Sequence, residues 1–277
     1  MVIEGNSSES WRLLEFSYSS VFQNLALEQT LARACISPVF VPVVRLWRNP
    51  QAVVVGRFQD VDAEVDLEAC RRNSIDIARR FTGGGAVFHD LGNLNLTIVI
   101  RRPSSTTLSR IHEGNSSVIL DMLTRLGVKG VFAPPNSIHV NGRKISGAAA
   151  ALGRDFILWH ASILVSTDTV MLRQVLAPSQ QIMKTSAIRS KRHPVTTLTE
   201  ELSGPVDMKH VQRTLLLSCQ SVLNAKFERS DLLDEEKQNS RLLYDKKYSS
   251  QDWNLHRYCE GEEWDRKRGG AHTTIAV

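Results

Sequence analysis

Three consecutive glycines at residues 83–85 lie between two stretches that read as β-strands, 75–81 and 94–100. Glycine loses more backbone entropy on folding than any other residue, so a triplet indicates that something must approach this backbone closely. A dinucleotide-binding loop or a P-loop needs a helix directly after its glycines, whereas a strand follows here. If the loop holds phosphate, backbone N–H groups in a turn would bind it, and Arg79 or Arg80 would add charge-assisted hydrogen bonds.

The residues on either side of the glycines decide between a binding site and a plain turn. Glycines alone would favour a turn without a ligand. Here two arginines precede the triplet, and His89 and Asp90 follow it closely. We therefore expect a binding site at this loop.

The rest of the chain is rich in strands first and in helices later. Apolar residues at helical spacing predict helices over residues 19–35, 61–73, 108–126 and 211–227, and a charged helix through 242–248. Strand-like runs occupy residues 41–48, 52–58, 137–140, 144–152 and 157–166. Asn49-Pro50-Gln51 predicts a hairpin between the first two runs, and Asn141-Gly142, the strongest such signal in the chain, predicts another.

This order of elements determines the expected fold class. Hairpins dominate, and strands do not alternate regularly with helices as they do in a doubly wound parallel sheet. We expect an α+β fold with a mixed, largely antiparallel sheet flanked by helices. The stretch after Tyr258 has no periodicity, so we expect one folded domain over residues 1–258 and a disordered tail over 259–277.

Composition excludes several classes of protein. The four cysteines are scattered without a Cys-x-x-Cys pair, which argues against a disulfide framework or a structural zinc site and favours a reducing compartment. The N-terminus does not resemble a signal peptide, and no apolar run is long enough to span a bilayer, so we expect a cytoplasmic protein without a membrane partner. The net charge of +5 is spread along the chain and aromatics make up only 6%, so we expect a mildly basic surface that does not bind nucleic acid, and such a surface suits an acidic protein partner.

The segment RRFTGGGAVFHDLGN, residues 79–93, resembles a pattern shared by lipoate–protein ligases, R-R-x-[ST]-G-G-G-[AT]-V-[FY]-H-D-x-G-N. The resemblance covers roughly residues 11–257 and is strongest to the short archaeal-type ligases. It implies the mixed α/β fold that these enzymes share with biotin–protein ligases, which is similar to that of class II synthetases. The other segments that carry the resemblance are residues 21–31, 46–60, 141–168 and 244–254.

The resemblance also implies a reaction and its partners. Lipoate–protein ligases join lipoate to ATP, forming lipoyl-AMP and pyrophosphate, and then transfer the lipoyl group to a lysine of an acceptor protein. The acceptors are lipoyl domains of 2-oxoacid dehydrogenase complexes and the H protein of glycine cleavage. ATP chemistry favours Mg²⁺, and in the short archaeal-type ligases a small accessory subunit supplies a domain that helps to form the adenylate.

Individual residues match the family's functional positions. Lys144, in R-K-I-S-G, matches the family lysine that contacts both the lipoate carboxylate and the phosphate. Ala148 matches a position that contacts lipoate, and His160 matches a histidine near the lipoyl site. The nucleotide-contacting stretch, with its neighbours in a supporting role, corresponds to Arg80, Gly83, Gly84, Gly85, Ala86, Val87, Phe88, His89 and Asp90.

The sequence departs from the family in one place, and a rival reaction stays open. Many ligases carry Asn-Asp where this chain has Asn136-Ser137, so we predict no metal-ligating residues. Octanoyltransferases that use a cysteine nucleophile carry it shortly before the lysine hairpin, where residues 127–140 contain none, and their loop reads T-G-G-R instead of T-G-G-G. A lipoyl or octanoyl transferase without a cysteine nucleophile, using a preformed acyl-AMP or an acyl carrier, is the alternative, and a non-catalytic lipoyl-nucleotide binding module is less favoured.

Overall fold

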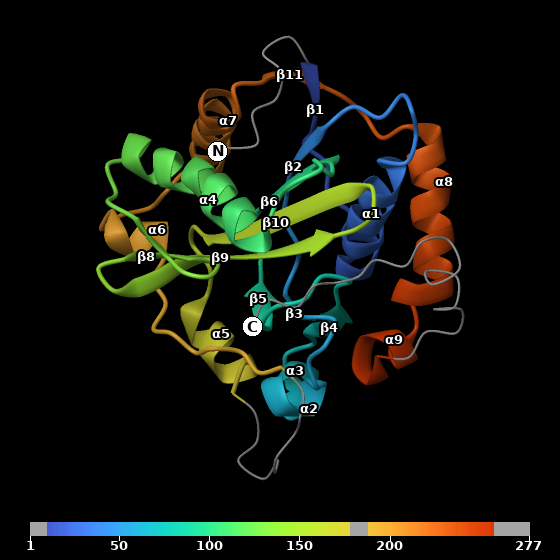
Figure 1. The fold of residues 1–277 in the computed structure, drawn as a ribbon. Coiled ribbons are helices and arrows are strands. Elements are labelled where there is room, and N and C mark those ends of the chain that lie inside the picture. Colours follow the sequence, from blue (N-terminus) through green and yellow to red (C-terminus); the bar gives the residue numbers. More distant parts are fainter. Residues whose placement is uncertain (1–9, 178–187, 258–277) are drawn as a thin grey trace.

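The computed structural model describes residues 10–177 and 188–257, in which a large mixed sheet and a small sheet carry helices on both sides (Figure 1). The α+β prediction is confirmed. Across the large sheet the strands are β11 (Lys226–Arg229), β1 (Ser10–Leu14), β2 (Val43–Trp47), β6 (Asn93–Arg101), β10 (Phe156–Leu164), β9 (Arg143–Leu152), β8 (Ser137–Val140) and β7 (Val131–Ala133). Within the large sheet, β1 pairs in parallel with β11 and β2, and the other neighbouring strands pair antiparallel. The small sheet has the order β4 (Asp76–Arg79), β3 (Ala52–Val55) and β5 (Val87–His89).

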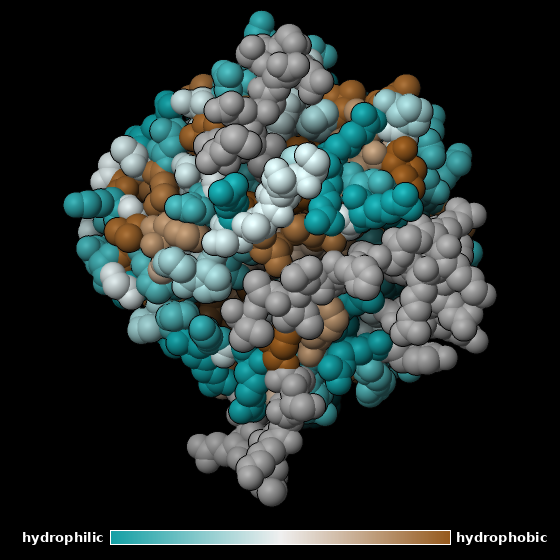
Figure 2. All heavy atoms as spheres, in the orientation of Figure 1, coloured by the Kyte–Doolittle hydropathy of each residue, from teal (hydrophilic) through white to brown (hydrophobic). Residues whose placement is uncertain are grey.

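Helices cover the two faces of the large sheet in different ways. α4 (Leu108–Arg125) and α7 (Met208–Leu223) pack on one face, and α1 (Val21–Ala34) lies on the other, against α8 (Asp234–Leu243) (Figure 1). The remaining described helices are α2 (Val61–Glu64), α3 (Leu67–Arg72), α5 (Thr169–Val175), α6 (Leu198–Glu201), the π-helical turn η1 (Tyr244–Tyr248) and α9 (Gln251–His256). On the outer face shown in Figure 2, apolar residues occur in small groups between polar ones, as on most globular surfaces.

Strand β6 shows how the sequence assigns these two faces. Successive side chains of a strand point to opposite faces, and in NLNLTIVIR the aliphatic residues Leu94, Leu96 and Ile98 join the core under α4 and α7. The alternate positions facing α1 are polar, at Asn95 and Thr97, and both are buried. Because buried polar groups need hydrogen-bond partners, this face contains more than a packed core.

Most of the predicted elements are present. The helices expected at 19–35, 61–73 and 108–126 correspond to α1, to the pair α2 and α3, and to α4. The turn at Asn141-Gly142 joins β8 to β9, with positive φ angles of 49° and 75° that Asn and Gly tolerate best. The tail predicted for 259–277 lies outside the described residues.

The hairpin predicted at residues 49–51 is wrong. β2 belongs to the large sheet and β3 to the small one, so the connection crosses between sheets. The buried Asn49 side chain holds this crossing, because its amide contacts His89 Nδ1 and its carbonyl accepts from Asn24 Nδ2. A local turn signal did not reveal these partners, which lie far away in the sequence.

The helix predicted over 211–227 begins earlier and ends earlier, at Met208 and Leu223, and four strands, β1, β5, β7 and β11, were missed. α7 ends at Leu223, where Asn224 adopts a left-handed φ of 48°, and β11 follows. β1 and β11 pair with each other in parallel, so neither has a local hairpin to identify it. β7 has only three residues. The strand predicted after the glycines is preceded by β5, which pairs with β3.

The arginine before the site, Arg79, fastens the C-terminal helix to the small sheet. Its guanidinium donates to the carbonyls of Trp253, Gly56 and Gln59 at 2.8–2.9 Å. Burial lowers the pKa of Arg79 to about 10, which leaves it charged. Arg79 is therefore a structural residue, and Arg80 remains the arginine at the glycine loop. No helix in the described ranges has both the length and the apolar character needed to cross a membrane.

Candidate active site

Two cavities adjoin at strands β9 and β10: the first lies beside the glycine loop and α1, and the second beside β5 and α5. The first has a volume of about 360 Å³ and the second about 220 Å³. Lys144 and Gly147 line both cavities, so the two spaces meet at the lysine predicted to be catalytic. All predicted site residues except Phe88 and Asp90 line the first cavity.

Phe88 and Asp90 have other surroundings. Phe88 is buried and lines the second cavity together with Ala86 and Val87. Asp90 lines neither cavity and accepts from the backbone N–H groups of Gly92 and Asp168 at 2.9 and 2.8 Å. Its carboxylate thus fixes the turn after β5 and the start of α5, a supporting role.

Arg80 shapes the glycine loop. Its Nη2 donates to the carbonyls of Gly83 and Gly85 at 2.6 and 2.7 Å, and its Nε donates to Thr82 Oγ1 at 3.0 Å. Gly84 has a φ of 87°, and a Cβ there would lie 3.0 Å from Arg80 Nη2. Burial lowers the pKa of Arg80 to about 10, with nearby Glu28 opposing the shift, so the guanidinium stays charged.

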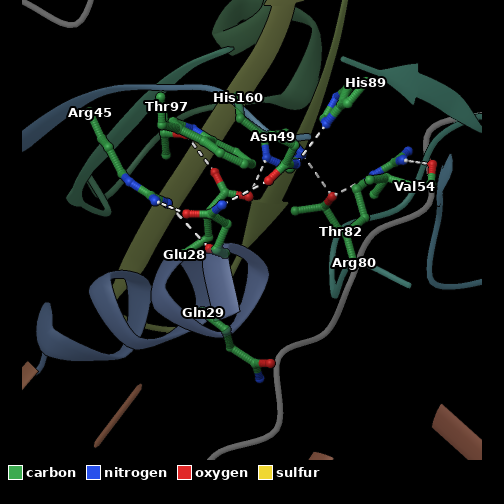
Figure 3. Close-up of polar contacts among 12 residues, drawn as sticks. Glu28, Gln29, Arg45, Asn49, Val54, Arg80, Thr82, His89, Thr97 and His160 are labelled. Atoms are coloured by element: carbon green, nitrogen blue, oxygen red, sulfur yellow. Dashed lines mark hydrogen bonds and ion pairs between the residues drawn. The ribbon is translucent and has the colours of Figure 1, made fainter. Parts of the chain in front are cut away.

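A chain of polar side chains connects the glycine loop to α1 (Figure 3). His160 Nε2 lies 2.9 Å from Thr82 Oγ1, and His160 Nδ1 lies 2.9 Å from Glu28 Oε2. Thr97 Oγ1 accepts from Trp47 Nε1 and donates to Glu28 Oε1 at 2.5 Å. Burial by itself would raise the pKa of Glu28, but attraction to His160 and the hydrogen bonds from His160 and Thr97 lower it. Glu28 is therefore a buried carboxylate.

A second polar chain holds His89 at the edge of the first cavity. Asn49 Nδ2 can only donate, so His89 Nδ1, 2.9 Å away, accepts and Nε2 carries the proton. Burial, followed by the charges of Arg80 and His160, lowers the pKa of His89 to about 3. His89 is consequently a neutral imidazole, in contact with Trp47 edge-to-face at 6.1 Å between ring centroids.

Lys144 combines a fixed backbone with an unpaired ammonium group. Its N–H donates to the Pro194 carbonyl at 2.7 Å and its carbonyl accepts from Thr196 N at 3.0 Å. Within the described ranges no hydrogen bond or ion pair engages its Nζ. Burial, and then Arg80, lower the pKa of Lys144. Gly147 leaves the space for the side chain, because a Cβ at 147 would lie 2.8 Å from Lys144 Nζ.

Two site residues have no strong signal in the sequence. Glu28 is a carboxylate on the buried side of a helix, which the apolar spacing of α1 could have revealed. Ser190 comes from a segment without secondary structure, and nothing local identifies it. Its Oγ accepts from Ala86 N at 2.9 Å and from Gln59 Nε2 at 3.0 Å. Ser190 thus contacts the backbone of the predicted nucleotide stretch.

Anionic acyl and phosphoryl groups suit this arrangement, which is typical of an enzyme that activates a carboxylate. Residues 20–220 match the lipoyl protein ligase A/B catalytic domain. Lipoate-protein ligase A subunit 1 of Thermoplasma acidophilum is 34% identical over 223 residues, covering 77% of this chain and 84% of that protein. The chain belongs to this family and is a lipoate–protein ligase, as the motif resemblance implied.

Solved structures agree with this identification. A bipartite lipoate protein ligase, described with its E2 lipoyl domain from T. acidophilum, superposes with a TM-score of 0.81 at 30% identity, covering 92% of this chain and 99% of that one. A lipoate-protein ligase A bound with ATP gives a TM-score of 0.80 at 29% identity, covering 90% and 100%. A T. acidophilum ligase with bound lipoic acid gives 0.78 at 29% identity, covering 89% and 99%.

The buried carboxylate generates a prediction about stability. Glu28→Gln should lower the free energy of unfolding by about 1.5–3 kcal/mol at neutral pH, the range for hydrogen bonds to charged groups. A carboxyl whose pKa is lower in the folded state stabilises the fold fully above its ordinary value of 4.5, and this contribution is lost as pH falls through the folded pKa. Urea unfolding of both proteins should therefore show a difference that shrinks in acid.

The matched control is Glu113→Gln on α4, because Glu113 is exposed. It should change the free energy of unfolding by less than about 0.5 kcal/mol at any pH. A Glu28→Gln effect that stayed constant from neutral pH down to acid would show that the carboxylate is not ionised in the fold.

Proposed function

We propose that this chain activates lipoate with ATP and transfers the lipoyl group to a lysine of acceptor lipoyl domains, with residues 1–258 as the catalytic domain. The observation that carries the proposal is the unpaired ammonium of Lys144 where two cavities meet, opposite a glycine loop held by Arg80. Related solved structures bind lipoic acid in one case and ATP in another, which supports both substrates.

The lining of each cavity suits one substrate. In the first cavity, Ala148 and its alanine neighbours form an apolar wall near His160 and Trp47, which fits the lipoyl chain. In the second, Ala86, Val87 and Phe88 offer a largely apolar surface for the nucleotide base. The lipoate carboxylate and the α-phosphate of ATP would then meet beside Lys144.

Fixed positive charge supplies the catalysis in this scheme. A lipoate carboxylate oxygen attacks the α-phosphorus, and the bond to the departing pyrophosphate breaks. Lys144 and the loop N–H groups would stabilise the charge that collects on the phosphoryl oxygens. In the second step the acceptor's amine attacks the acyl carbon, a C–N bond forms, and AMP leaves with the electron pair of the broken C–O bond.

Mg²⁺ would assist through the phosphates. In the described part of the chain, no group of three or more His, Cys, Asp or Glu side chains could hold a metal ion. Asn136 donates instead to the carbonyl of Ala148 at 2.7 Å, and Ser137 beside it is buried. This chain therefore fits Mg²⁺ held mainly by phosphate oxygens and water, with charge neutralisation as its contribution.

The names of related proteins support a proposal about the protein partners of this chain. One relative is named subunit 1, and one solved structure is described as bipartite, with an E2 lipoyl domain. We propose that this chain likewise modifies lipoyl domains of 2-oxoacid dehydrogenase complexes and the glycine-cleavage H protein. A small accessory subunit would assist adenylation.

Replacing the central lysine tests the proposed chemistry. Lys144→Ala should reduce lipoyl-AMP formation about 100- to 1,000-fold, the scale for loss of one preorganised charge-stabilising donor. Pyrophosphate release with lipoate and with octanoate, in the presence of the accessory chain, measures this. Lys209→Ala, at an exposed position on α7, is the control and should match the wild type. Near-normal adenylation by a folded Lys144→Ala protein would refute the assignment.

A cysteine-dependent transferase, unlike a ligase, would need a reactive cysteine as its nucleophile. Cys35, Cys70 and Cys219 are free and buried, and burial raises the pKa of Cys35 to about 12 and that of Cys70 to about 11. Thiols in this state are poor nucleophiles. A variant with all four cysteines replaced by serine or alanine should keep most of its acyl transfer, provided that it folds. Trapping an acyl-thioester on the wild-type chain would establish covalent transfer instead.

Separate assays of the two half-reactions test the accessory subunit. We expect the isolated chain to form lipoyl-AMP slowly and to transfer from preformed lipoyl-AMP more readily. Adding a candidate accessory chain should then restore ATP use. Full adenylation by the isolated chain would exclude the need for a partner, and transfer that no candidate chain could couple to ATP would favour the lipoyl-transferase alternative.

A further inference from the structure

Two histidines outside the predicted site, His139 and His193, lie beside Lys144. Their rings contact each other edge-to-face at 5.2 Å between centroids, and both line the first cavity. His139 is the strand partner of Lys144 across β8 and β9. His193 directly precedes Pro194, whose carbonyl accepts from Lys144 N. The two imidazoles thus come from the backbone segments on either side of the lysine.

The other imidazoles of this cavity are already engaged. His160 contacts Glu28 and Thr82 through its two nitrogens, and His89 Nδ1 accepts from Asn49. His112 Nδ1 accepts from Trp159 Nε1 at 3.2 Å. His139 Nε2, in contrast, is buried and has no hydrogen-bond partner in the described part of the chain. The pair therefore includes a ring nitrogen that no hydrogen bond of the described residues engages.

Burial and the neighbouring charges both disfavour the protonated form of His139. Lys144 faces it from β9 and His193 from the segment before Pro194, while β7 on its other side places Val131 opposite. Burial, then His193, then Lys144 lower the pKa of His139. A neutral imidazole carries one unprotonated ring nitrogen, which can accept a proton. It is less suited to clamp an anion, which would need the charged form.

We infer that the His139–His193 pair is the general base of the transfer step, taking a proton from the incoming lysine ammonium of the acceptor. This inference rests on the proposed function. The imidazole takes one ammonium proton, and the freed amine attacks the acyl carbon of lipoyl-AMP. The C–N bond forms, and the C–O bond breaks with its electron pair leaving on AMP. The second proton of the new amide nitrogen passes to the AMP phosphate or to solvent.

The test compares two nucleophiles on preformed lipoyl-AMP. The acceptor lysine is protonated at about neutral pH and needs a base, whereas hydroxylamine is already unprotonated and needs none. The double variant His139→Gln/His193→Gln should lower the ratio of lysine transfer to hydroxamate formation by about 100-fold, a typical contribution of general-base catalysis. Raising the pH should recover transfer, because more of the lysine is then unprotonated.

Further variants separate a base from a structural role. His193 is exposed, so His193→Gln should fold normally and lower the same ratio to a smaller extent. His210→Gln on α7, also at an exposed position, should leave the ratio at the wild-type value. Equal losses of lysine transfer and hydroxamate formation, or an unchanged ratio in the folded double variant, would overturn the inference. A wild-type chain that formed neither product would overturn the proposed function and the base together.

Discussion

The buried guanidinium of Arg80 is the interaction on which the site depends. A charge taken out of water is costly unless its N–H groups are all directed at acceptors. Each of the three nitrogens of Arg80 donates to at least one acceptor, among the carbonyls of Val54, Gly83 and Gly85 and the hydroxyl of Thr82. Glycine is needed in this loop because its backbone must turn both carbonyls towards one side chain. The conformation of the loop and the position of the charge are thus set by the same bonds.

The carboxylate that balances this charge lies at a distance, on α1. Glu28 reaches Arg80 only through His160 and Thr82, so the direct partners of the guanidinium are neutral carbonyls and a hydroxyl. Lys144 adds a second positive charge without an anion of its own among the described residues. Arg80 already lowers the pKa of Lys144, which means that the two cations repel each other. An anion bound near both cations would relieve this repulsion, so the site is electrostatically suited to a negatively charged ligand.

The parts of this site that the sequence predicted are those encoded locally. The glycine triplet, the Asn141-Gly142 turn and the R-K-I-S-G segment each carry their constraint within a few residues. Ser190 and Asn49 act through partners more than twenty residues away, so no local pattern identifies their roles. The parallel pairing of β1 with β11 failed to be predicted for the same reason, since it joins strands from opposite ends of the described chain.

The geometry around Lys144 also bears on how one site can serve two reactions. The two cavities meet at this lysine, so an acyl chain in one and a nucleotide in the other would bring carboxylate and α-phosphate together. The acyl carbon would then lie at the junction, with both cavities filled. The acceptor lysine would then have to approach from a side of Lys144 that neither substrate fills. On the surface beside Lys144, His139 and the exposed residues Lys191 and His193 line the first cavity. The same positive charge that neutralises phosphate would repel an approaching ammonium, so the transfer step needs a way to remove the proton before attack.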